Sequence, residues 1–245
     1  MIKKKKKLNI VIPMAWAWIR FVEQWYKLPK PLIKIRWKKM FEWAVSSFDF
    51  LKDYYDITFI FIVLKEHVNK FNIYEEIKSK YIKSHVIILN KITSWQAETV
   101  LMAKKFIDKN KLIIYNSDTY SDYNIKDFLI HNEDIDWFIT CFKSSNKAYS
   151  YAEIDDIWNV IKVAEKQLIS KNATNWLYYY KNWTEFLCSI EEMIKNKDYV
   201  NWEFYVWPVY NYLINKWKII KVCPIKKNWI LWTPTELNYF LLNYK

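Results

Sequence analysis

Asp118 is the residue whose type and position best suit a metal ion. It follows the apolar run KLIIYN (111–116), which we predict to be a buried strand. In open α/β sheets, ligands bind outside the carboxyl ends of the strands. Mg²⁺ prefers carboxylate oxygens and takes its other ligands from water and substrate phosphates. We therefore predict that Asp118 binds Mg²⁺, with an Asp that only caps the next turn as the common alternative.

Two cations are placed where they could neutralise phosphate charge. Arg20 follows the predicted strand 8–13, and it is one of only two arginines among 38 basic residues. Its planar guanidinium offers the bidentate contact to phosphate that lysine cannot make. Lys30 lies between Pro29 and Pro31, whose restricted backbones keep the segment extended. Such a segment can aim one ammonium group at a fixed point.

The tryptophan and glycine content of the chain is abnormal. Fifteen Trp and no Gly occur in 245 residues, whereas an average chain of this length has roughly seventeen Gly. Several Trp lie in turns or at helix starts, where a positive φ or a close approach to a ligand favours glycine. These are Trp16, Trp18, Trp95, Trp202 and Trp232.

We interpret most of the Trp as standing where the organism inserts glycine, through a TGA codon that the source reads as glycine. The alternative is a truly Trp-rich protein with a large aromatic core. Two Trp are predicted to be genuine in either case. Trp43 has helical spacing within KKMFEWAVSSF, and Trp229 follows a Lys-Lys-Asn turn.

The bulk composition fits one cytoplasmic domain that spans residues 1–245. The net charge of +12 favours polyanionic small ligands such as nucleotides. We do not expect a nucleic-acid partner, because five of the Lys form one terminal run, Lys3 to Lys7. Three widely spaced cysteines each lie in an apolar stretch, which predicts buried free thiols in a reducing compartment. They are Cys141, Cys188 and Cys223.

A membrane role is not expected either. The start of the chain imitates a secretory signal, but Pro13 and Arg20 interrupt its apolar run and no small-residue cleavage site follows. No other apolar run reaches the roughly 18 residues that span a bilayer.

Strands and helices alternate through about residue 135. Apolar runs predict strands over 8–13, 56–64, 85–89 and 111–116, and helical periodicity predicts helices over 40–51, 67–81, 96–108 and 124–131. Residues 28–33 are expected to be extended. This alternation is typical of a doubly wound α/β fold, in which a mostly parallel sheet is flanked by helices.

The pattern changes in the second half. Strands are predicted over 138–142, 149–154, 159–164, 176–180 and 218–225, and helices over 184–196, 207–216 and 233–243. We expect a nucleotide-binding half over 1–135 and a mixed half over 136–245, within one domain.

Seven segments give the chain a resemblance to the sugar nucleotidyltransferases along nearly its whole length. The segments are PMAWAWIRF (13–21), KLPKPLI (27–33), WQAETV (95–100), NSD (116–118), VAEK (163–166), NWEFYVWPVYN (201–211) and WTPTELNYF (232–240). The family loop has glycines where this chain has Trp16 and Trp18, and two indoles there would fill the phosphate pocket. The resemblance implies a Rossmann-like nucleotide-diphospho-sugar transferase fold with a mixed, mostly parallel sheet.

The resemblance also implies site residues. Catalysis would involve Arg20, Lys30 and Asp118, with Mg²⁺ held by Asp118 and by a second acidic residue, for which Glu203 is the nearest match. The nucleotide would contact Ala15, Trp16, Ala17, Trp18, Arg20, Gln96 and Thr99. The sugar would contact Glu165, Lys166, Asn175 and Trp176.

The expected reaction is nucleotidyl transfer from a nucleoside triphosphate to a sugar 1-phosphate, with release of pyrophosphate. A glycosyltransferase of related fold that uses a nucleotide-sugar donor is one alternative, and an inactive nucleotide-sugar-binding relative is another. The sequence leaves open the base, the sugar and whether the chain forms a homo-oligomer.

Overall fold

The computed structural model describes residues 5–16, 21, 23–107, 110–122 and 135–244. The predicted helix 124–131 and the site residues Ala17, Trp18 and Arg20 lie outside these ranges. None of the helices in the described part of the chain has the length and apolar content that a membrane crossing requires.

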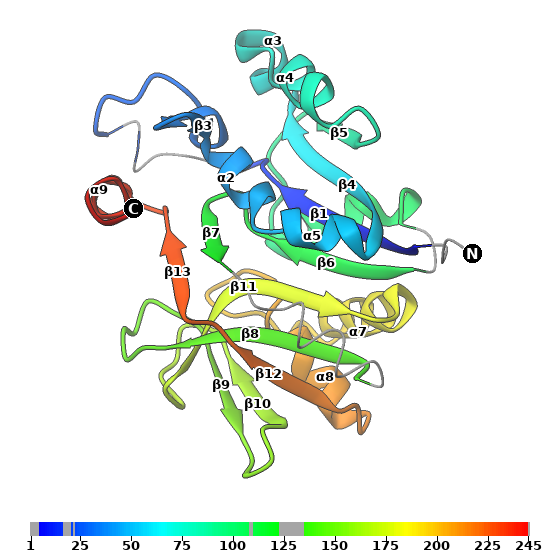
Figure 1. Ribbon diagram of the computed structural model, residues 1–245. Coiled ribbons are helices and arrows are strands. Elements are labelled where there is room, and N and C mark those ends of the chain that lie inside the picture. The colour runs from blue at the N-terminus through cyan, green and yellow to red at the C-terminus, as the bar shows by residue number, and fades with distance from the viewer. Residues whose placement is uncertain (1–4, 17–20, 22, 108–109, 123–134, 245) are drawn as a thin grey trace.

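A nine-stranded sheet runs through the molecule (Figure 1). Its first half is parallel, in the order β5–β4–β1–β6. These strands are β1 (Lys6–Pro13), β4 (Tyr55–Leu64), β5 (His85–Leu89) and β6 (Lys111–Tyr115). This is the strand order of a doubly wound fold. The order in which the strands follow one another reverses between the neighbouring strands β1 and β6. The predicted fold class is confirmed.

The second half of the sheet is mixed. β11 lies antiparallel to β6 and so joins the two halves into one sheet, while β12 lies parallel to β8. The strands of this half are β8 (Trp137–Lys143), β9 (Tyr151–Ile154), β10 (Val160–Ala164), β11 (Asn172–Tyr180) and β12 (Ile220–Pro224).

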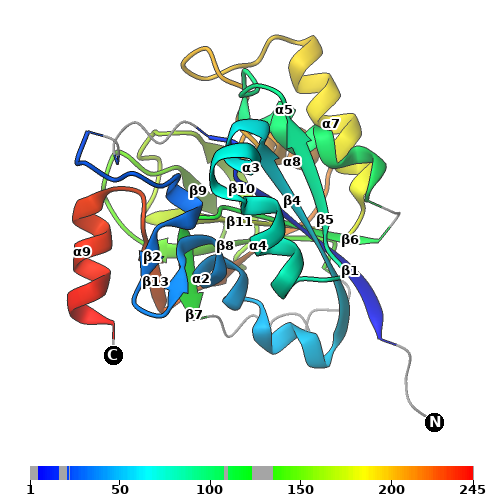
Figure 2. The ribbon, with the colours of Figure 1, turned by 90° about the horizontal axis from the view of Figure 1, so that it is seen from above.

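Helices cover both faces of the sheet (Figure 2). Alternate residues of β1 show this, because Val11 packs in one core cluster while Ile10 and Ile12 pack in the other. The Val11 cluster includes α5 (Gln96–Leu101), α7 (Trp183–Lys195) and α8 (Val209–Asn215). The other includes α2 (Met40–Ser46) and α4 (Ile73–Lys80). Burial on both faces explains why β1 and β4 are almost continuously apolar.

Three predicted helices differ from the structure. The helix predicted over 67–81 is two helices, α3 (Lys65–Phe71) and α4, because Asn72 has a φ of 52° between them. The predicted helix 40–51 ends at Ser46 and is followed by a 3-10 turn, η2 (Asp49–Asp53). The predicted helix 96–108 ends at Leu101 and continues as η3 (Met102–Lys105).

The extended segment predicted over 28–33 is wrong at its centre. There Leu32 N–H donates to the Pro29 carbonyl, which makes the turn η1 (Lys30–Leu32). Four short strands were not predicted, because each is too short to show periodicity. They are β2 (Lys34–Ile35), β3 (Lys38–Lys39), β7 (Thr119–Asp122) and β13 (Lys227–Ile230).

A third core cluster surrounds Trp43 and the C-terminal helix α9 (Pro234–Asn243). Trp43 is 1% exposed, and its Nε1 donates to the Ile35 carbonyl over 3.0 Å. Phe240 and Tyr244 meet its ring edge-on, and both also pack against Trp229. The packing of Trp43 and Trp229 supports both as genuine tryptophans.

The cysteine prediction holds for two of the three thiols. Cys141 and Cys223 are buried and free, whereas Cys188 is exposed on α7. The expectation that all three are buried is therefore wrong, because an amphipathic helix places one side of an apolar stretch in solvent.

Candidate active site

The candidate site lies where the strand order of the sheet reverses. Ala15 and Trp16 lie two and three residues after the end of β1, and Asp118 lies between β6 and β7. The carboxyl ends of these neighbouring parallel strands form the crevice in which open α/β folds bind ligands.

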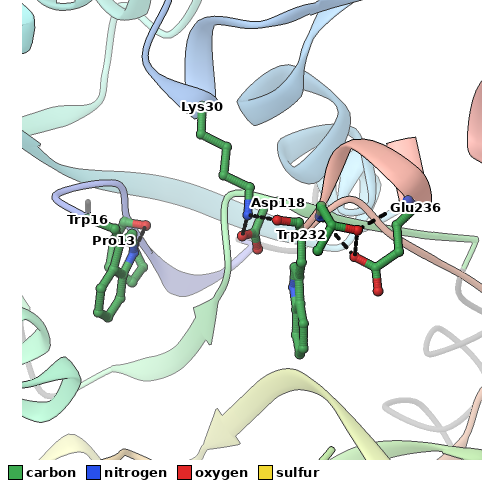
Figure 3. A network of polar contacts seen from close by, with 7 residues as sticks. Pro13, Trp16, Lys30, Asp118, Trp232 and Glu236 are labelled. Atoms are coloured by element: carbon green, nitrogen blue, oxygen red, sulfur yellow. Dashed lines mark hydrogen bonds and ion pairs between the residues drawn. The ribbon is translucent and has the colours of Figure 1, made fainter. Parts of the chain in front are cut away.

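Lys30 and Asp118 form the centre of this site. The distance from Lys30 Nζ to Asp118 Oδ2 is 2.5 Å, and each side chain is 18% exposed. Lys30 Nζ also donates to the Trp232 carbonyl over 3.2 Å, which links the pair to the segment before α9 (Figure 3). The structure therefore brings together two of the three predicted catalytic residues; the third, Arg20, lies outside the described residues.

Local structure holds both side chains in place. Lys30 opens the turn η1, and its ammonium lies 5.4 Å from the centre of the Phe21 ring. The Asp118 carbonyl accepts from Leu231 N–H over 2.9 Å. This bond fixes the segment before β7 to the segment after β13.

Asp118 retains capacity to bind a cation. Its Oδ1 is buried and has no hydrogen-bond partner among the described residues, although Oδ2 is occupied by Lys30. A buried carboxylate oxygen without a partner is costly, so a ligand for it is favourable. The described residues contain no group of three or more His, Cys, Asp or Glu that could hold a metal. Asp118 thus fits Mg²⁺ only with water and substrate phosphate as the remaining ligands.

The start of the predicted phosphate loop carries an indole. Ala15 is fully buried, and Trp16 Nε1 donates to the Pro13 carbonyl over 3.1 Å. Figure 3 shows the indoles of Trp16 and Trp232 on either side of the Lys30–Asp118 contact, both pointing to the same side. Trp232 borders the site, because its carbonyl accepts from Lys30 Nζ.

The predicted base-binding residues join the two halves of the chain. Gln96 is 7% exposed, and its Oε1 accepts from Val206 N–H over 3.1 Å. Ala97 N–H next to it donates to the Phe204 carbonyl over 3.0 Å. Thr99 is fully buried and bonds to the hydroxyl of Thr93. Contacts of Gln96 and Thr99 with a base stay a prediction.

A second cluster surrounds Glu165, one of the predicted sugar-binding residues. Glu165 is 4% exposed, and its Oε2 has no hydrogen-bond partner in the part of the chain that the structure describes. Burial raises the pKa of Glu165 to about 7, while a hydrogen bond from Ser150 and the charge of Lys166 lower it and Glu203 raises it. Lys166 Nζ donates to Tyr205 Oη over 2.7 Å. Contacts of Glu165 and Lys166 with a sugar stay a prediction.

Glu203 lies with this second cluster rather than with Asp118. It is exposed, it interacts electrostatically with Glu165, and its side chain hydrogen-bonds Tyr205. The structure does not bring Glu203 to Asp118, so a metal shared by the two gains no support from this placement.

Asn175 and Trp176 follow one another on β11 but face different surroundings. Asn175 is fully buried, where it accepts a hydrogen bond from Thr140 and donates to Ser121 over 3.1 Å. Its contact with sugar therefore stays a prediction. Trp176 is 7% exposed and packs edge-on against Trp232, with 4.0 Å between the ring centres.

Tyr149 and Ser150 are candidate site residues that the sequence did not reveal. The Tyr149 ring lies 5.9 Å from Trp176 and 5.8 Å from Trp232. Ser150 bonds to Glu165 and so connects this aromatic group to the second cluster. Both lie at the start of the strand predicted over 149–154 but precede β9, which begins at Tyr151, and only the spacing to VAEK could have drawn attention to them.

The backbone supports the interpretation that glycine belongs at many Trp positions. Among the described residues, five Trp have a φ between 60° and 66°, in the left-handed region that bulky residues avoid. Four of them are exposed, by 46% to 93%, which leaves their indoles without burial. The five are Trp25, Trp158, Trp176, Trp202 and Trp217. Of the five Trp that the sequence marked as glycine-like, only Trp202 is among them.

Known proteins were compared with the chain by sequence and by structure. No protein-family model matches, and no curated protein matches by sequence. A nucleoside-diphosphate-sugar pyrophosphorylase from Vibrio cholerae RC9 matches in structure with a TM-score of 0.85 and 27% identity, over 96% of this chain and 100% of that one.

Two further solved structures share the fold at lower identity. The inositol-1-phosphate CTP transferase from T. maritima has a TM-score of 0.73 and 11% identity, over 98% of both chains. A UDP-glucose pyrophosphorylase in complex with UDP-glucose has a TM-score of 0.74 and 14% identity, over 97% of this chain and 98% of that one. The resemblance inferred from the motifs is confirmed: the structural neighbours of this chain are sugar-phosphate nucleotidyltransferases and nucleoside-diphosphate-sugar pyrophosphorylases.

Proposed function

We propose that this chain transfers a nucleotidyl group from a nucleoside triphosphate to a sugar 1-phosphate, giving a nucleotide-sugar and pyrophosphate. The observation that carries the proposal is the Lys30–Asp118 pair at the strand-order reversal, in a chain that matches a pyrophosphorylase over 96% of its length. A triphosphate substrate needs both cationic neutralisation and a carboxylate that can bind Mg²⁺, and this pair supplies one of each.

In the proposed reaction, an oxygen of the sugar phosphate attacks the α-phosphorus in line. The bond to the β-phosphate breaks, and its electron pair leaves with pyrophosphate. The attacking phosphate is already an anion, so no general base is required, and the protein contributes alignment and charge neutralisation. Lys30 and Arg20 would offset charge on the β- and γ-phosphates.

Mg²⁺ would bind the free oxygen of Asp118, and when bound it would neutralise charge on the phosphates. We assign the nucleotide to the half over 1–135 and the sugar phosphate to the half over 136–245, near Glu165 and Lys166. The three free thiols favour a reducing cytoplasm, where the product would serve polysaccharide synthesis. A glycosyltransferase role is less favoured, because the neighbours include pyrophosphorylases and nucleotidyltransferases.

The test uses a chain in which glycine replaces the Trp of the turns and of the left-handed positions, here named the glycine-form chain. Its substitutions are W16G, W18G, W25G, W95G, W158G, W176G, W202G, W217G and W232G. Pyrophosphate release is measured with a panel of nucleoside triphosphates and sugar 1-phosphates in Mg²⁺. We expect release that needs both substrates, and a folded chain that releases none with any pair would refute the proposal.

A further inference from the structure

The peptide group between Trp232 and Thr233 is held at both of its ends. Its carbonyl oxygen, which belongs to Trp232, accepts a hydrogen bond from Lys30 Nζ over 3.2 Å. Its N–H, which belongs to Thr233, donates to Glu236 Oε2 over 2.9 Å. Figure 3 shows the resulting line of polar contacts, from Glu236 through this peptide to Lys30 and Asp118. One peptide group therefore connects a carboxylate in the first turn of α9 to the ammonium of the candidate site.

The Glu236 carboxylate is fixed by the capping box at the start of α9. Thr233 is the N-cap residue, and its hydroxyl accepts from Glu236 N–H over 3.3 Å and donates to Glu236 Oε2 over 3.1 Å. The reciprocal bonds of a capping box satisfy N–H groups that a helix start leaves free. Pro234, the first residue of the helix, restricts the backbone at the same point. Local structure thus sets the position of this carboxylate, independently of Lys30.

The geometry of the peptide group carries this fixation to the candidate site. A trans peptide is planar, so its N–H and C=O bonds point in opposite directions. The part of the chain that the structure describes has no cis peptide. Because Glu236 fixes the direction of the N–H, it also fixes the direction of the Trp232 carbonyl. A carboxylate bonded to the N–H polarises the peptide as well, which makes its carbonyl a stronger acceptor for the Lys30 ammonium.

The Trp232 carbonyl is the second of two oxygen acceptors around the Lys30 ammonium. The first is Asp118 Oδ2, at 2.5 Å. Asp118 is also the proposed ligand of Mg²⁺, so its negative charge is shared between two cations. The carbonyl has no such second task, and it belongs to the main chain, so it holds the ammonium whichever side chain stands at position 232. Its direction therefore matters for where Lys30 lies.

We propose that Glu236 positions Lys30 for the reaction through the peptide group between Trp232 and Thr233. Glu236 acts through this peptide, so it is a positioning residue and not a catalytic one. It keeps the carbonyl directed at the ammonium, and Lys30 then meets the substrate phosphates in one fixed place. The effect on turnover rests on the proposed function, whereas the hold on Lys30 does not.

Amine labelling measures the hold on Lys30 without reference to turnover. Limiting acetic anhydride acetylates the lysines of the Trp-containing chain. Peptide mass spectrometry then gives the labelling of Lys30 relative to that of Lys70, which forms an exposed ion pair with Glu66. We expect E236A to raise this ratio by about 2- to 10-fold, the factor that corresponds to the net loss of one hydrogen bond. E236Q keeps an acceptor oxygen in the same place, so it should recover most of the protection.

N182A is the matched control. Asn182 is the N-cap of α7, and its side chain accepts from Thr184 N–H over 2.9 Å. N182A removes a helix cap, as E236A does, so it should destabilise the protein comparably and leave the Lys30 labelling ratio unchanged. A ratio in E236A equal to that of the parent would overturn the proposal. An equal rise in N182A would also overturn it, because a general loosening of the fold would then explain the result.

Turnover of the glycine-form chain measures the consequence for the reaction. We expect E236A to lower kcat by up to about 100-fold, as a small displacement of an active-site group can do. Because Glu236 acts through Lys30, E236A should lower kcat no further in a chain that already carries K30M. A further fall in the double variant would overturn the proposal. If Lys30 labelling responds as expected but no substrate pair reacts in the parent, the hold on Lys30 stands and the proposed function fails.

E236D tests the same contact if E236A folds poorly. It keeps a negative charge in the first turn of α9, where the helix dipole favours one, but its carboxylate is one methylene shorter. We expect E236D to raise the Lys30 labelling ratio with little loss of stability. Protection of Lys30 in E236D equal to that in the parent would contradict the role of Glu236.

Discussion

Lys30 Nζ lies 2.5 Å from Asp118 Oδ2, although 88 residues separate the two in the chain. The ion pair connects the turn η1 to the segment after β6, and the Trp232 carbonyl accepts a second hydrogen bond from the ammonium. Because each side chain is 18% exposed, the pair is neither buried nor fully solvated. A partly buried pair at the mouth of a crevice can exchange partners when a charged substrate enters.

Loss of the Asp118 charge should abolish most turnover of the glycine-form chain. In that chain D118N keeps the shape of the side chain but removes the carboxylate that would bind Mg²⁺ and orient Lys30. We expect kcat to fall by about 10²–10³-fold, the usual effect of removing one stabilising group from a transition state. Pyrophosphate release at saturating substrate is the measurement.

Asp49 provides the matched control. It forms an exposed ion pair with Lys52, with each side chain 54% exposed, on the separate turn η2. D49N should leave kcat unchanged, because exposed ion pairs contribute little. Equal activity of D118N and D49N would remove Asp118 from the mechanism.

The same Trp→Gly change should have opposite effects at different positions. Trp158 and Trp217 are exposed and have φ values of 66° and 60°. W158G and W217G should each raise the free energy of unfolding by about 1 kcal/mol, because relief of left-handed strain exceeds the entropy cost of glycine. W43G should lower it by about 3–5 kcal/mol, because Trp43 fills the third core cluster.

Urea unfolding of the three variants measures these changes. Destabilisation by W158G and W217G would contradict the glycine interpretation and favour a truly Trp-rich protein. The gene offers an independent check: we expect TGA codons at Trp25, Trp158 and Trp217, and TGG at Trp43.

The sequence predicted the fold because its strongest signals are long apolar strands. The apolar runs around 56–64 and 111–116 correspond to β4 and β6. Both faces of these strands are covered, which explains why apolar and polar residues do not alternate along them. The elements it missed are short and depend on tertiary contacts. β7 and β13 pair with each other, from Asp122 opposite Lys227 to Thr119 opposite Ile230, so the pairing joins distant parts of the chain and no local pattern could reveal it.

The candidate site was predictable only in part. Lys30 was marked by its two prolines and Asp118 by its strand, and the structure joins them. Glu203 was placed from a motif alone, and its loop carries it to Glu165 instead. Tyr149 could not be predicted, because its contacts with Trp176 of β11 and with Trp232 before α9 form only in the folded chain.

Burial of Glu165 should make the stability of the protein depend on pH. The pKa of its carboxyl is about 7 in the folded state and 4.5 in its ordinary state. Between these values the folded state binds more protons than the unfolded state, so the free energy of unfolding decreases as pH rises from about 5 to above 7. E165Q has no carboxyl group that must ionise at this buried position. Its free energy of unfolding relative to that of the parent should therefore increase over that pH range by about 3 kcal/mol.

Chemical unfolding at pH 5, 6, 7 and 8 tests this expectation. E191Q, at an exposed position on α7, is the control and should follow the parent at every pH. A constant difference between E165Q and the parent across the series would show that Glu165 ionises normally. In the glycine-form chain, the KM for the sugar phosphate should also decrease as pH rises through about 7, because the ionised carboxylate is the better acceptor of sugar hydroxyls.

Arg36 should stabilise the C-terminal helix and take no part in the reaction. Its Nη2 donates to the carbonyls of Leu241 and Tyr244 over 2.8 and 2.6 Å, which satisfies groups that a helix end leaves free. We expect R36A to lower the free energy of unfolding by about 1–2 kcal/mol. Hydrogen exchange over 238–244 should increase with it, while kcat of the glycine-form chain stays unchanged.

R36K separates charge from geometry at this position. Lysine retains the positive charge near the end of α9 but cannot reach two carbonyls with one planar group. We therefore expect R36K to recover only part of the stability lost in R36A, and to leave exchange at Tyr244 fast. Full recovery by R36K would mean that the charge alone stabilises the helix end, whereas a fall in kcat with either variant would place Arg36 in the active site.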